Sequence, residues 1–300
     1  MKSRTRFDKV FDFVNVALMA VLMVIILYPL YFTVIASFSD PYRLMRGEVL
    51  FLPKGITLDA YKNVLKNDEI WMGYLNTILY ASTGTVYALA ITIPTAYALS
   101  RQELRGRSVF MGYFMFTMYF SGGMVPGYVL IKQLGLLNTR YAMVIPAGMS
   151  VYNMIIANSF FKSSIPKELY EAARIDGANE YRTFFQVALP LSGAIIAVIA
   201  LYTLVGHWNS YFAALLYLND DAKFPLQLVL RNILLENQQL KIMETSSLDT
   251  KQLEAIQRRA MMAETMKYAL IFISSLPVLA AYPFVQKYFV KGVMIGAVKG

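Results

Sequence analysis

The chain of 300 residues contains no cysteine and a single histidine, His207. Without cysteine it can form neither a disulfide framework nor a thiolate metal site. One histidine and no acidic pair in an apolar segment leave nothing to assemble into a nucleophile and base or an acid–base set. The sequence also lacks the phosphate-binding pattern G-x-x-x-x-G-K-[ST]. We therefore expect a chain without catalytic residues, metal or cofactor of its own.

Charge is also scarce, because only 16% of the residues are charged and 57% are hydrophobic. This exceeds the apolar content that a soluble domain of this length needs. About 20 apolar residues suffice to cross a hydrocarbon layer of about 30 Å. The sequence therefore predicts an all-α membrane protein with six transmembrane helices, at about 14–38, 72–99, 109–131, 141–161, 191–218 and 268–286.

The six predicted spans contain no Asp, Glu, Lys or Arg. A carrier driven by protons or sodium normally keeps buried carboxylates for its coupling ion near the middle of the membrane. The absence of such residues argues against a secondary transporter and indicates that another polypeptide supplies the energy.

Six spans place four segments on the same side of the membrane: 1–13, 100–108, 162–190 and 287–300. Basic residues are denser in these segments than in the segments on the other side. Arg101, Arg105 and Arg107 in the short second segment are the clearest signal. Because Lys and Arg favour the cytoplasmic side, both termini and segment 162–190 are predicted to be cytoplasmic. This orientation accounts for the net charge of +9 without nucleic-acid binding.

Segment 162–190 carries the most informative pattern of the chain. Glu171-Ala172-Ala173 is followed after three residues by Gly177, and after nine more by Val187-Ala188-Leu189-Pro190. We expect a short helix from about Pro166 to Asp176, a sharp turn at Gly177, a second short helix, and a proline that opens the next span. Such a helical elbow presents a carboxylate to a soluble partner.

The spacing of these residues resembles the EAA loop of ATP-binding-cassette import permeases. Trp208-Asn209 and the ending 286–296 extend the similarity to the whole chain. They identify it with the carbohydrate-uptake branch, MalG-like and closest to the LplC/YtcP-type oligosaccharide permeases. Val187 departs mildly from the isoleucine that is commoner there. The resemblance implies a type I importer fold, with a permease domain at 14–292, an outer loop at 219–267 and a cytoplasmic tail at 293–300.

The resemblance also implies the partners and the coupling residues. The partners would be a second permease, two ATPase subunits that hold ATP and Mg²⁺, and an extracytoplasmic solute-binding protein, in the plasma membrane of a prokaryote. Glu171 would pair with a basic residue of the ATPase, and Ala172 and Ala173 would let the helix seat closely. Gly177 would permit the turn, and Leu189 and Pro190 would complete the motif. Arg174, Asp176, Glu180 and Arg182 could be solvated charge or a rim that selects the ATPase.

Candidate residues of the substrate path are less specific. Gly122 and Gly123 interrupt the third span, as a packing kink or a gate. Tyr152 and Asn153 in the fourth span, and His207, Trp208, Asn209 and Tyr211 in the fifth, combine aromatic faces with hydrogen-bonding groups that suit a sugar. Trp208 and Tyr211 could instead form an interfacial aromatic belt.

Function is predicted to be ATP-driven import of an oligosaccharide by alternating access. Import of another solute, such as a peptide, is the nearest alternative. A secondary transporter, a membrane enzyme and a purely structural membrane protein are the others.

Overall fold

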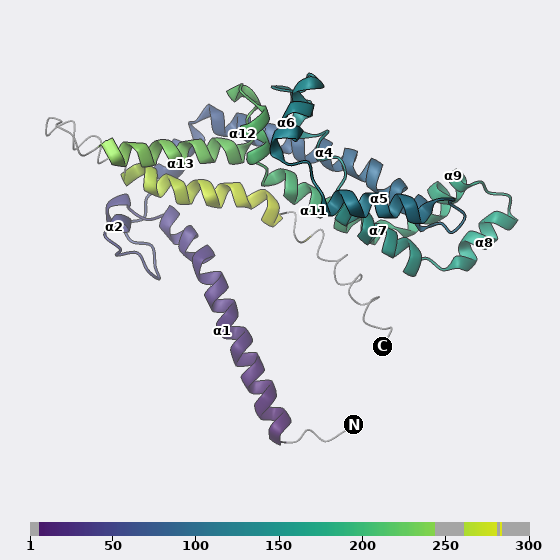
Figure 1. Ribbon diagram of the computed structural model, residues 1–300. Helices are drawn as coiled ribbons and strands as arrows, with labels where there is room; N and C mark the ends of the chain where they lie inside the picture. The colour runs from purple at the N-terminus through teal and green to yellow at the C-terminus, as the bar shows by residue number, and fades with distance from the viewer. Residues whose placement is uncertain (1–5, 244–260, 281–282, 284–300) are drawn as a thin grey trace. The chain divides into compact units, whose positions relative to one another are not determined.

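The computed structural model describes residues 6–243, 261–280 and 283, and every regular element among them is helical (Figure 1). The chain divides into two compact units, Met1–Asp68 with Leu230–Leu276, and Glu69–Val229 with Pro277–Gly300. The predicted cytoplasmic tail at 293–300 and residues 244–260 of the predicted outer loop lie outside the described residues.

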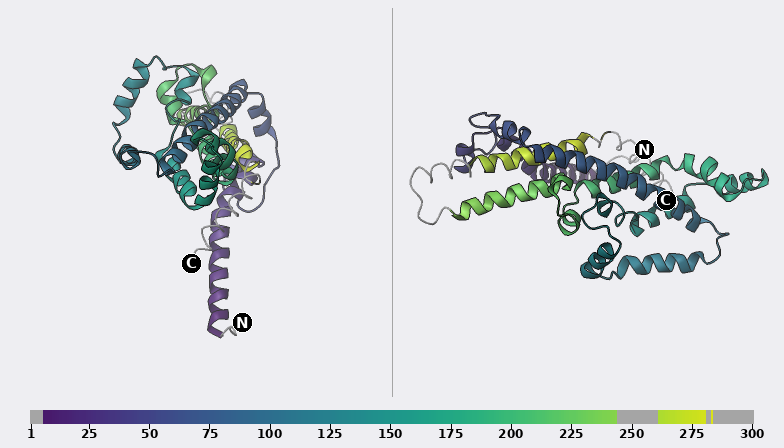
Figure 2. Two further views of the ribbon diagram at one scale, coloured as in Figure 1. Left: turned by 90° about the vertical axis from the view of Figure 1, so that its right-hand side faces the viewer. Right: turned by 90° about the horizontal axis from the view of Figure 1, so that it is seen from above.

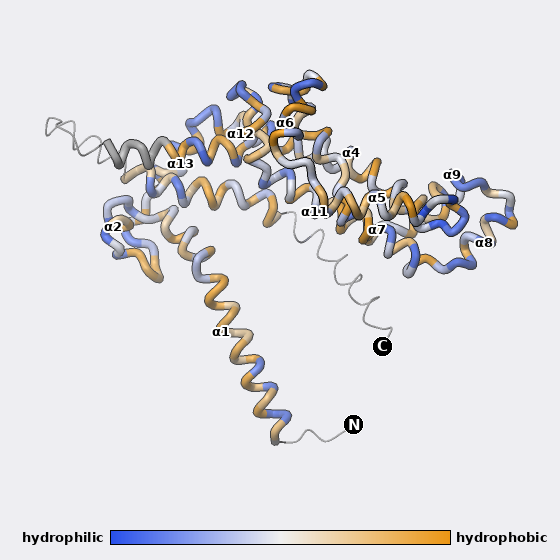
Figure 3. The backbone as a smooth tube through the Cα atoms, viewed as in Figure 1, coloured by the Kyte–Doolittle hydropathy of each residue, from blue (hydrophilic) through white to orange (hydrophobic). Residues whose placement is uncertain are grey.

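The first unit begins with α1 (Arg6–Ser37), an apolar helix of 32 residues. Figure 3 shows its hydrophobic colour along most of its length, and nearly all of its side chains up to Tyr31 are exposed in this chain. Only its last turns are buried, where Ile35 and Ala36 pack with Leu44 of α2 (Pro41–Met45). The short helix α3 (Asp59–Leu65) follows. Lipid or another protein must therefore cover α1.

The second unit is organised around α4 (Asp68–Ser100), an uninterrupted helix of 33 residues (Figures 1 and 2). Its C-terminal half shares a core with α7 (Val151–Ser163) and α11 (Gly193–Trp208), which includes Ala96, Phe161 and Ile199. Asn158 of α7 is buried and donates its amide to the Ala96 carbonyl at 2.9 Å. The bond satisfies a polar group that would otherwise be costly to bury.

The third predicted span, 109–131, is broken where Gly122 and Gly123 stand. The helices α5 (Arg107–Tyr119) and α6 (Met124–Gln133) meet at 111°. Gly123 has a φ of +88°, which a residue with a side chain rarely adopts. The break therefore follows directly from the glycines.

The fourth predicted span, 141–161, is not one helix. It contains the 3₁₀ turn η1 (Arg140–Met143), an irregular segment, and most of α7, which has only 13 residues. Pro146 cannot donate a helical hydrogen bond. At Gly148 an added Cβ would lie 2.4 Å from the Tyr87 ring, so the irregular segment lies directly against α4.

The segment before α11 is bent as well. It consists of α8 (Lys167–Ile175), α9 (Glu180–Thr183), a π-helical turn η2 (Phe184–Ala188) and α10 (Leu189–Leu191), and the helix Glu180–Leu191 meets α11 at 78°. After α11 come α12 (Phe212–Tyr217), η3 (Asp221–Lys223) and α13 (Leu226–Met243). Thus part of the predicted outer loop is a long helix.

Three helices of the described chain are long and apolar enough to span a membrane: Phe7–Ser37, Asp68–Ser100 and Met261–Ala280. The two bent pairs raise this number to five if each is one span. Within the described residues, the last helix already includes the seven residues before the predicted sixth span.

Gly84 of α4 permits the close approach of α11, because an added Cβ would lie 2.2 Å from Nε2 of His207. We expect Gly84→Val to destabilise the protein by about 1–3 kcal/mol through overpacking, measured as a lower melting temperature in detergent. Gly112→Val is the matched control, because a Cβ at this helical glycine would meet nothing within 4 Å. Equal melting temperatures of the two variants would contradict this packing.

Candidate functional site

The predicted elbow is present with the expected local structure. Helix α8 runs between Pro166 as N-cap and Asp176 as C-cap. Gly177 then adopts a φ of +74° and donates its N–H to the Arg174 carbonyl at 3.0 Å. An added Cβ at Gly177 would touch nothing within 4 Å, so glycine is needed there for its backbone conformation and not for space. The side chain of Asn179 caps α9 at the backbone N–H of Arg182.

The two faces of the elbow differ. Tyr170 and Phe184 are buried in the core of the second unit, and Ala173 is buried as well. Glu171 and Ala172 are exposed, and so are two large apolar side chains, Ile175 at 86% and Tyr181 at 79%. Figure 3 shows α8 and α9 as the strongly hydrophilic end of the second unit. An exposed carboxylate beside exposed apolar groups is the composition of a docking surface.

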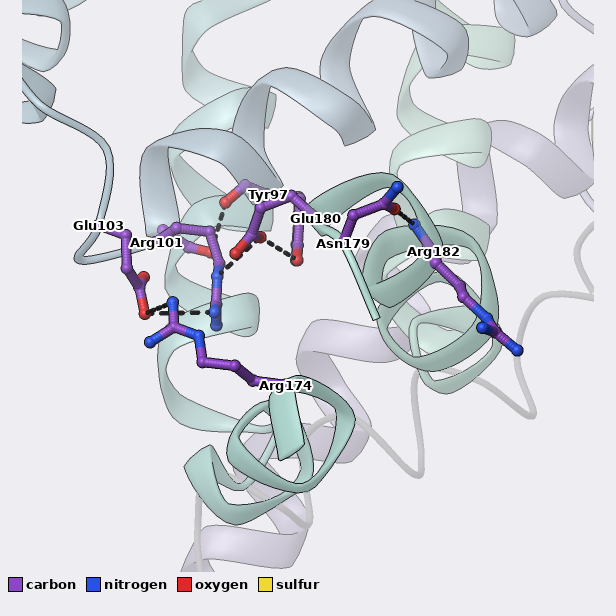
Figure 4. A network of polar contacts seen from close by, with 8 residues as sticks. Tyr97, Arg101, Glu103, Arg174, Asn179, Glu180 and Arg182 are labelled. Atoms are coloured by element: carbon purple, nitrogen blue, oxygen red, sulfur yellow. Dashed lines mark hydrogen bonds and ion pairs between the residues drawn. The ribbon is translucent and has the colours of Figure 1, made fainter. Parts of the chain in front are cut away.

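A network of charged side chains attaches the elbow to the end of α4 (Figure 4). Nε of Arg101 lies 3.4 Å from Oε2 of Glu180, and the Tyr97 hydroxyl donates to the same oxygen at 3.0 Å. Arg174 of α8 donates to Oε1 of Glu103 at 3.0 Å, and Arg101 lies 3.5 Å from that oxygen. The loop after α4 thus contacts both helices of the elbow.

Arg101 is the centre of this network. Its side chain is only 13% exposed, and its guanidinium carbon lies 4.2 Å from the centroid of the Tyr170 ring. A buried cation needs such partners, because an unpaired charge out of water is costly. Burial raises the pKa of Tyr170. The pKa of Glu103 is lowered by a bond to its own backbone N–H and by the charges of Arg101 and Arg174.

No local pattern in the sequence indicates this network. From the sequence, Arg101 is only a charge that indicates orientation, and Tyr97 and Tyr170 have no assigned role. The partners are separated by 71 and 83 residues, and no local pattern signals such pairs. Two predicted surface charges, Arg174 and Glu180, are therefore partners of residues in their own chain.

A cavity of about 410 Å³ lies between this loop and α8. Glu171, Lys162 and Lys167 are among the charged residues that line it. Desolvation and the nearby charge of Arg107 lower the pKa of Lys162. Leu189, at the end of the motif, packs against the core, whereas Pro190 is exposed at the bend before α11. The motif thus combines docking residues with residues that hold the elbow in place.

The structure brings together three of the predicted path residues. Tyr152, Asn153 and His207 line one cavity of about 520 Å³ in the second unit. It is bounded by α4, η1, α7, α11 and α12.

The other predicted path residues do not line this cavity. Trp208 is buried and contacts Tyr74, with ring centroids 6.1 Å apart. Asn209 is the exposed C-cap of α11, and Tyr211 precedes α12 and contacts Phe212. Gly122 and Gly123 are exposed at the α5–α6 bend.

This chain is similar to known transport proteins over nearly its whole length. Residues 1–295 match the family described as the inner membrane component of binding-protein-dependent transport systems. Protein LplC of Bacillus subtilis (strain 168) is 38% identical over 296 residues, covering 99% of this chain and 97% of that protein. The polygalacturonan/rhamnogalacturonan transport system permease protein YtcP of the same organism is 36% identical, covering 98% of this chain and 99% of that protein.

A solved structure is similar over almost the same length. It is a chain in the crystal structure of a bacterial ABC transporter involved in the import of the acidic polysaccharide alginate. The TM-score is 0.84 and the identity 34%, over 96% of this chain and 100% of that chain.

These matches confirm the predicted resemblance, the all-helical type I import-permease fold and the role of a non-catalytic membrane transport subunit. The chain belongs to the family of inner membrane components of binding-protein-dependent transport systems.

Proposed function

We propose that this chain is one of two permease subunits of an ATP-driven importer of oligosaccharides, and that the elbow at 162–190 is its contact with the ATPase. The observation that carries the proposal is the elbow itself, which exposes Glu171 and Ile175 while its other face is fixed to the chain. Oligosaccharide is preferred to peptide because YtcP is named for transport of polygalacturonan and rhamnogalacturonan, and the similar structure for alginate import.

The complete assembly would contain a second permease, two ATPase subunits with ATP and Mg²⁺, and an extracytoplasmic solute-binding protein. The permease domain at 14–292 would cross the membrane six times, with both termini and the elbow in the cytoplasm. The exposed apolar side chains of α1 support a neighbour or lipid around this helix.

Force from the ATPase would reach the spans through the Arg101 network. An ATPase that moves α8 also moves Arg174, which is bonded to Glu103 on the loop after α4. Glu180 on α9 is joined to Arg101 on the same loop. Two attachment points resist rotation of the elbow on its own, so its displacement would be passed to α4. Opening and closing of the path would then follow ATP binding and hydrolysis.

The identity of the importer is tested by reconstituting the chain with its partner permease, ATPase and binding protein in proteoliposomes. A panel would contain neutral galacto- and arabino-oligosaccharides, oligogalacturonates and short peptides. We expect ATP-dependent uptake of an oligosaccharide. Uptake of peptides alone, or uptake that requires an ion gradient instead of ATP, would contradict the proposed function.

Gly177→Pro should abolish ATP-driven uptake, because proline fixes φ near −65° and Gly177 requires +74°. Gly177→Asn is the control, since asparagine tolerates the left-handed region, and it should retain most of the uptake. Uptake by Gly177→Pro equal to that of the unmodified complex would remove Gly177 from the coupling site.

Glu171→Gln should reduce co-purification of the ATPase by about tenfold, a loss of roughly 1.4 kcal/mol that is typical of a charge-assisted contact. Glu168→Gln lies on the same helix, is exposed, and should have little effect. If both variants retained the ATPase equally well, Glu171 would not be a docking residue.

The network is tested by a double-mutant cycle with Arg101→Met and Glu180→Gln. Each single variant should lower the amount of sugar transported per ATP hydrolysed, and the double variant should be no worse than Arg101→Met, because the two residues act as a pair. Arg105→Met, an exposed cation of the same loop, should leave this ratio unchanged. Additive losses would show that Arg101 and Glu180 do not act together.

A further inference from the structure

The cavity of about 410 Å³ beside α8 has the size of a small-molecule site, which is typically about 300–1,000 Å³. Its walls come from the loop after α4, the start of α5, the end of α7 and the first half of α8. All the residues that line it belong to the second unit. The cavity therefore lies where the ends of two apolar helices meet the elbow.

The wall of this cavity is strongly basic. Two of the lining residues are anionic, Glu103 and Glu171, and five are cationic, which gives a net charge of +3: Arg101, Arg107, Lys162, Lys167 and Arg174. Arg101 and Arg174 are already paired with carboxylates of the network. In the part of the chain that the structure describes, the side chains of Arg107, Lys162 and Lys167 form no ion pair or hydrogen bond. These three cations are available to an anion from outside the chain.

Arg107 and Lys162 reach the cavity from different helices. Arg107 is the first residue of α5, and Lys162 lies in the last turn of α7. Burial and the nearby charge of Arg107 lower the pKa of Lys162. Neighbouring cations without a counter-charge repel each other, so an anion between them stabilises both. The arrangement points to a bound anion.

The surroundings of the cations favour an anion that also has an apolar part. Phe161 and Ile165 line the cavity and are buried. Directly after Arg107, α5 exposes large apolar side chains, with Val109 at 74% and Phe110 at 52%. Exposed apolar groups on a membrane helix contact acyl chains, and basic pockets between such helices bind anionic lipid head groups. A phospholipid matches both parts of this surface, whereas a soluble anion matches only the cations.

We propose that this cavity binds the phosphate of an anionic phospholipid from the leaflet on the elbow's side of the membrane. Arg107 and Lys162 contribute most, because Glu171 lies four residues after Lys167 on α8 and reduces the attraction there. The acyl chains lie along the exposed face of α5. Lys167 belongs to the elbow, so the bound lipid joins the elbow to the ends of α5 and α7. This site goes beyond the proposed function and does not depend on the transported substrate.

The absence of cysteine from the chain allows a direct test. Gln102 lines the cavity and is exposed, so Gln102→Cys places a single thiol at its rim. The variant is assembled with cysteine-free partner subunits and purified in a neutral detergent. The rate of labelling with a small uncharged thiol reagent is then measured during titration with phosphatidylglycerol, phosphatidylcholine or inorganic phosphate.

We expect phosphatidylglycerol to slow the labelling of Gln102→Cys. At ten times its dissociation constant the rate should fall by roughly tenfold, since the free fraction of sites falls by 1 + [L]/Kd. Phosphatidylcholine has no net charge and inorganic phosphate has no acyl chain. Each should need a concentration at least roughly tenfold higher for the same protection, because each lacks one of the two kinds of contact.

Two charge-matched double variants locate the site. Arg107→Gln with Lys162→Gln removes two cations from the cavity and should weaken the protection by more than roughly tenfold. Arg105→Gln with Arg182→Gln removes two exposed cations that do not line the cavity, and the protection should be unchanged. If the first pair does not assemble, Lys167→Gln, an exposed change on α8, should weaken the protection by itself.

Three results would overturn the inference. They are no protection by phosphatidylglycerol, equal protection in the two double variants, and equal potency of phosphatidylcholine or inorganic phosphate. Equal potency of inorganic phosphate would assign the cavity to a soluble anion. ATP-dependent uptake by the unmodified complex is a separate measurement, whose absence would reject the proposed function and leave the lipid titration unaffected.

Discussion

The buried guanidinium of Arg101 is the interaction on which the arrangement of the elbow depends. It lies against Tyr170 of α8, pairs with Glu180 of α9 and approaches Glu103 on its own loop. The Arg101 side chain is only 13% exposed, whereas Glu180 and Glu103 are 54% and 44% exposed, so solvent partly screens the ion pairs and the contact with the Tyr170 ring adds to them. The short helices α8 and α9 could not hold their angle by backbone bonds alone, since both are only a few residues long. Together with the buried side chains of Tyr170 and Phe184, Arg101 therefore fixes the elbow to the end of α4.

Charged residues are concentrated outside the apolar middle parts of the long helices. This distribution accounts for a chain that forms the membrane part of the transporter while another subunit supplies the energy. The six predicted spans contain no Asp, Glu, Lys or Arg, because the carboxylates of the long helices stand near the helix ends, such as Asp12 in α1 and Glu69 in α4, and the cavity inside the second unit has a neutral wall. The charged residues of the elbow lie at the end of α4, where a soluble partner can reach them. A chain with this distribution depends on another subunit for the energy of transport.

The sequence predicted the helical class and the elbow because both follow from local rules. Runs of apolar residues identify membrane helices. The turn after α8 needs a residue with a positive φ, and Gly177 supplies it. The shape of the spans was less predictable. The 111° and 78° bends and the irregular segment before α7 depend on packing, such as Gly148 against Tyr87. Likewise, the Arg101–Glu180 and Arg174–Glu103 ion pairs join residues far apart in the sequence, so no local pattern could predict them. For the same reason Trp208, a good sugar-binding candidate by type, lies against Tyr74 instead of in the cavity.

The central claim is that the elbow faces the cytoplasm, where an ATPase can bind it. Ile175 is 86% exposed on α8, and the chain has no other thiol to interfere with a single Ile175→Cys substitution. In intact cells that lack the ATPase, a membrane-impermeant maleimide should leave this cysteine unmodified, and it should react once the cytoplasmic side is opened. Full labelling in intact cells would place the elbow outside and contradict the account.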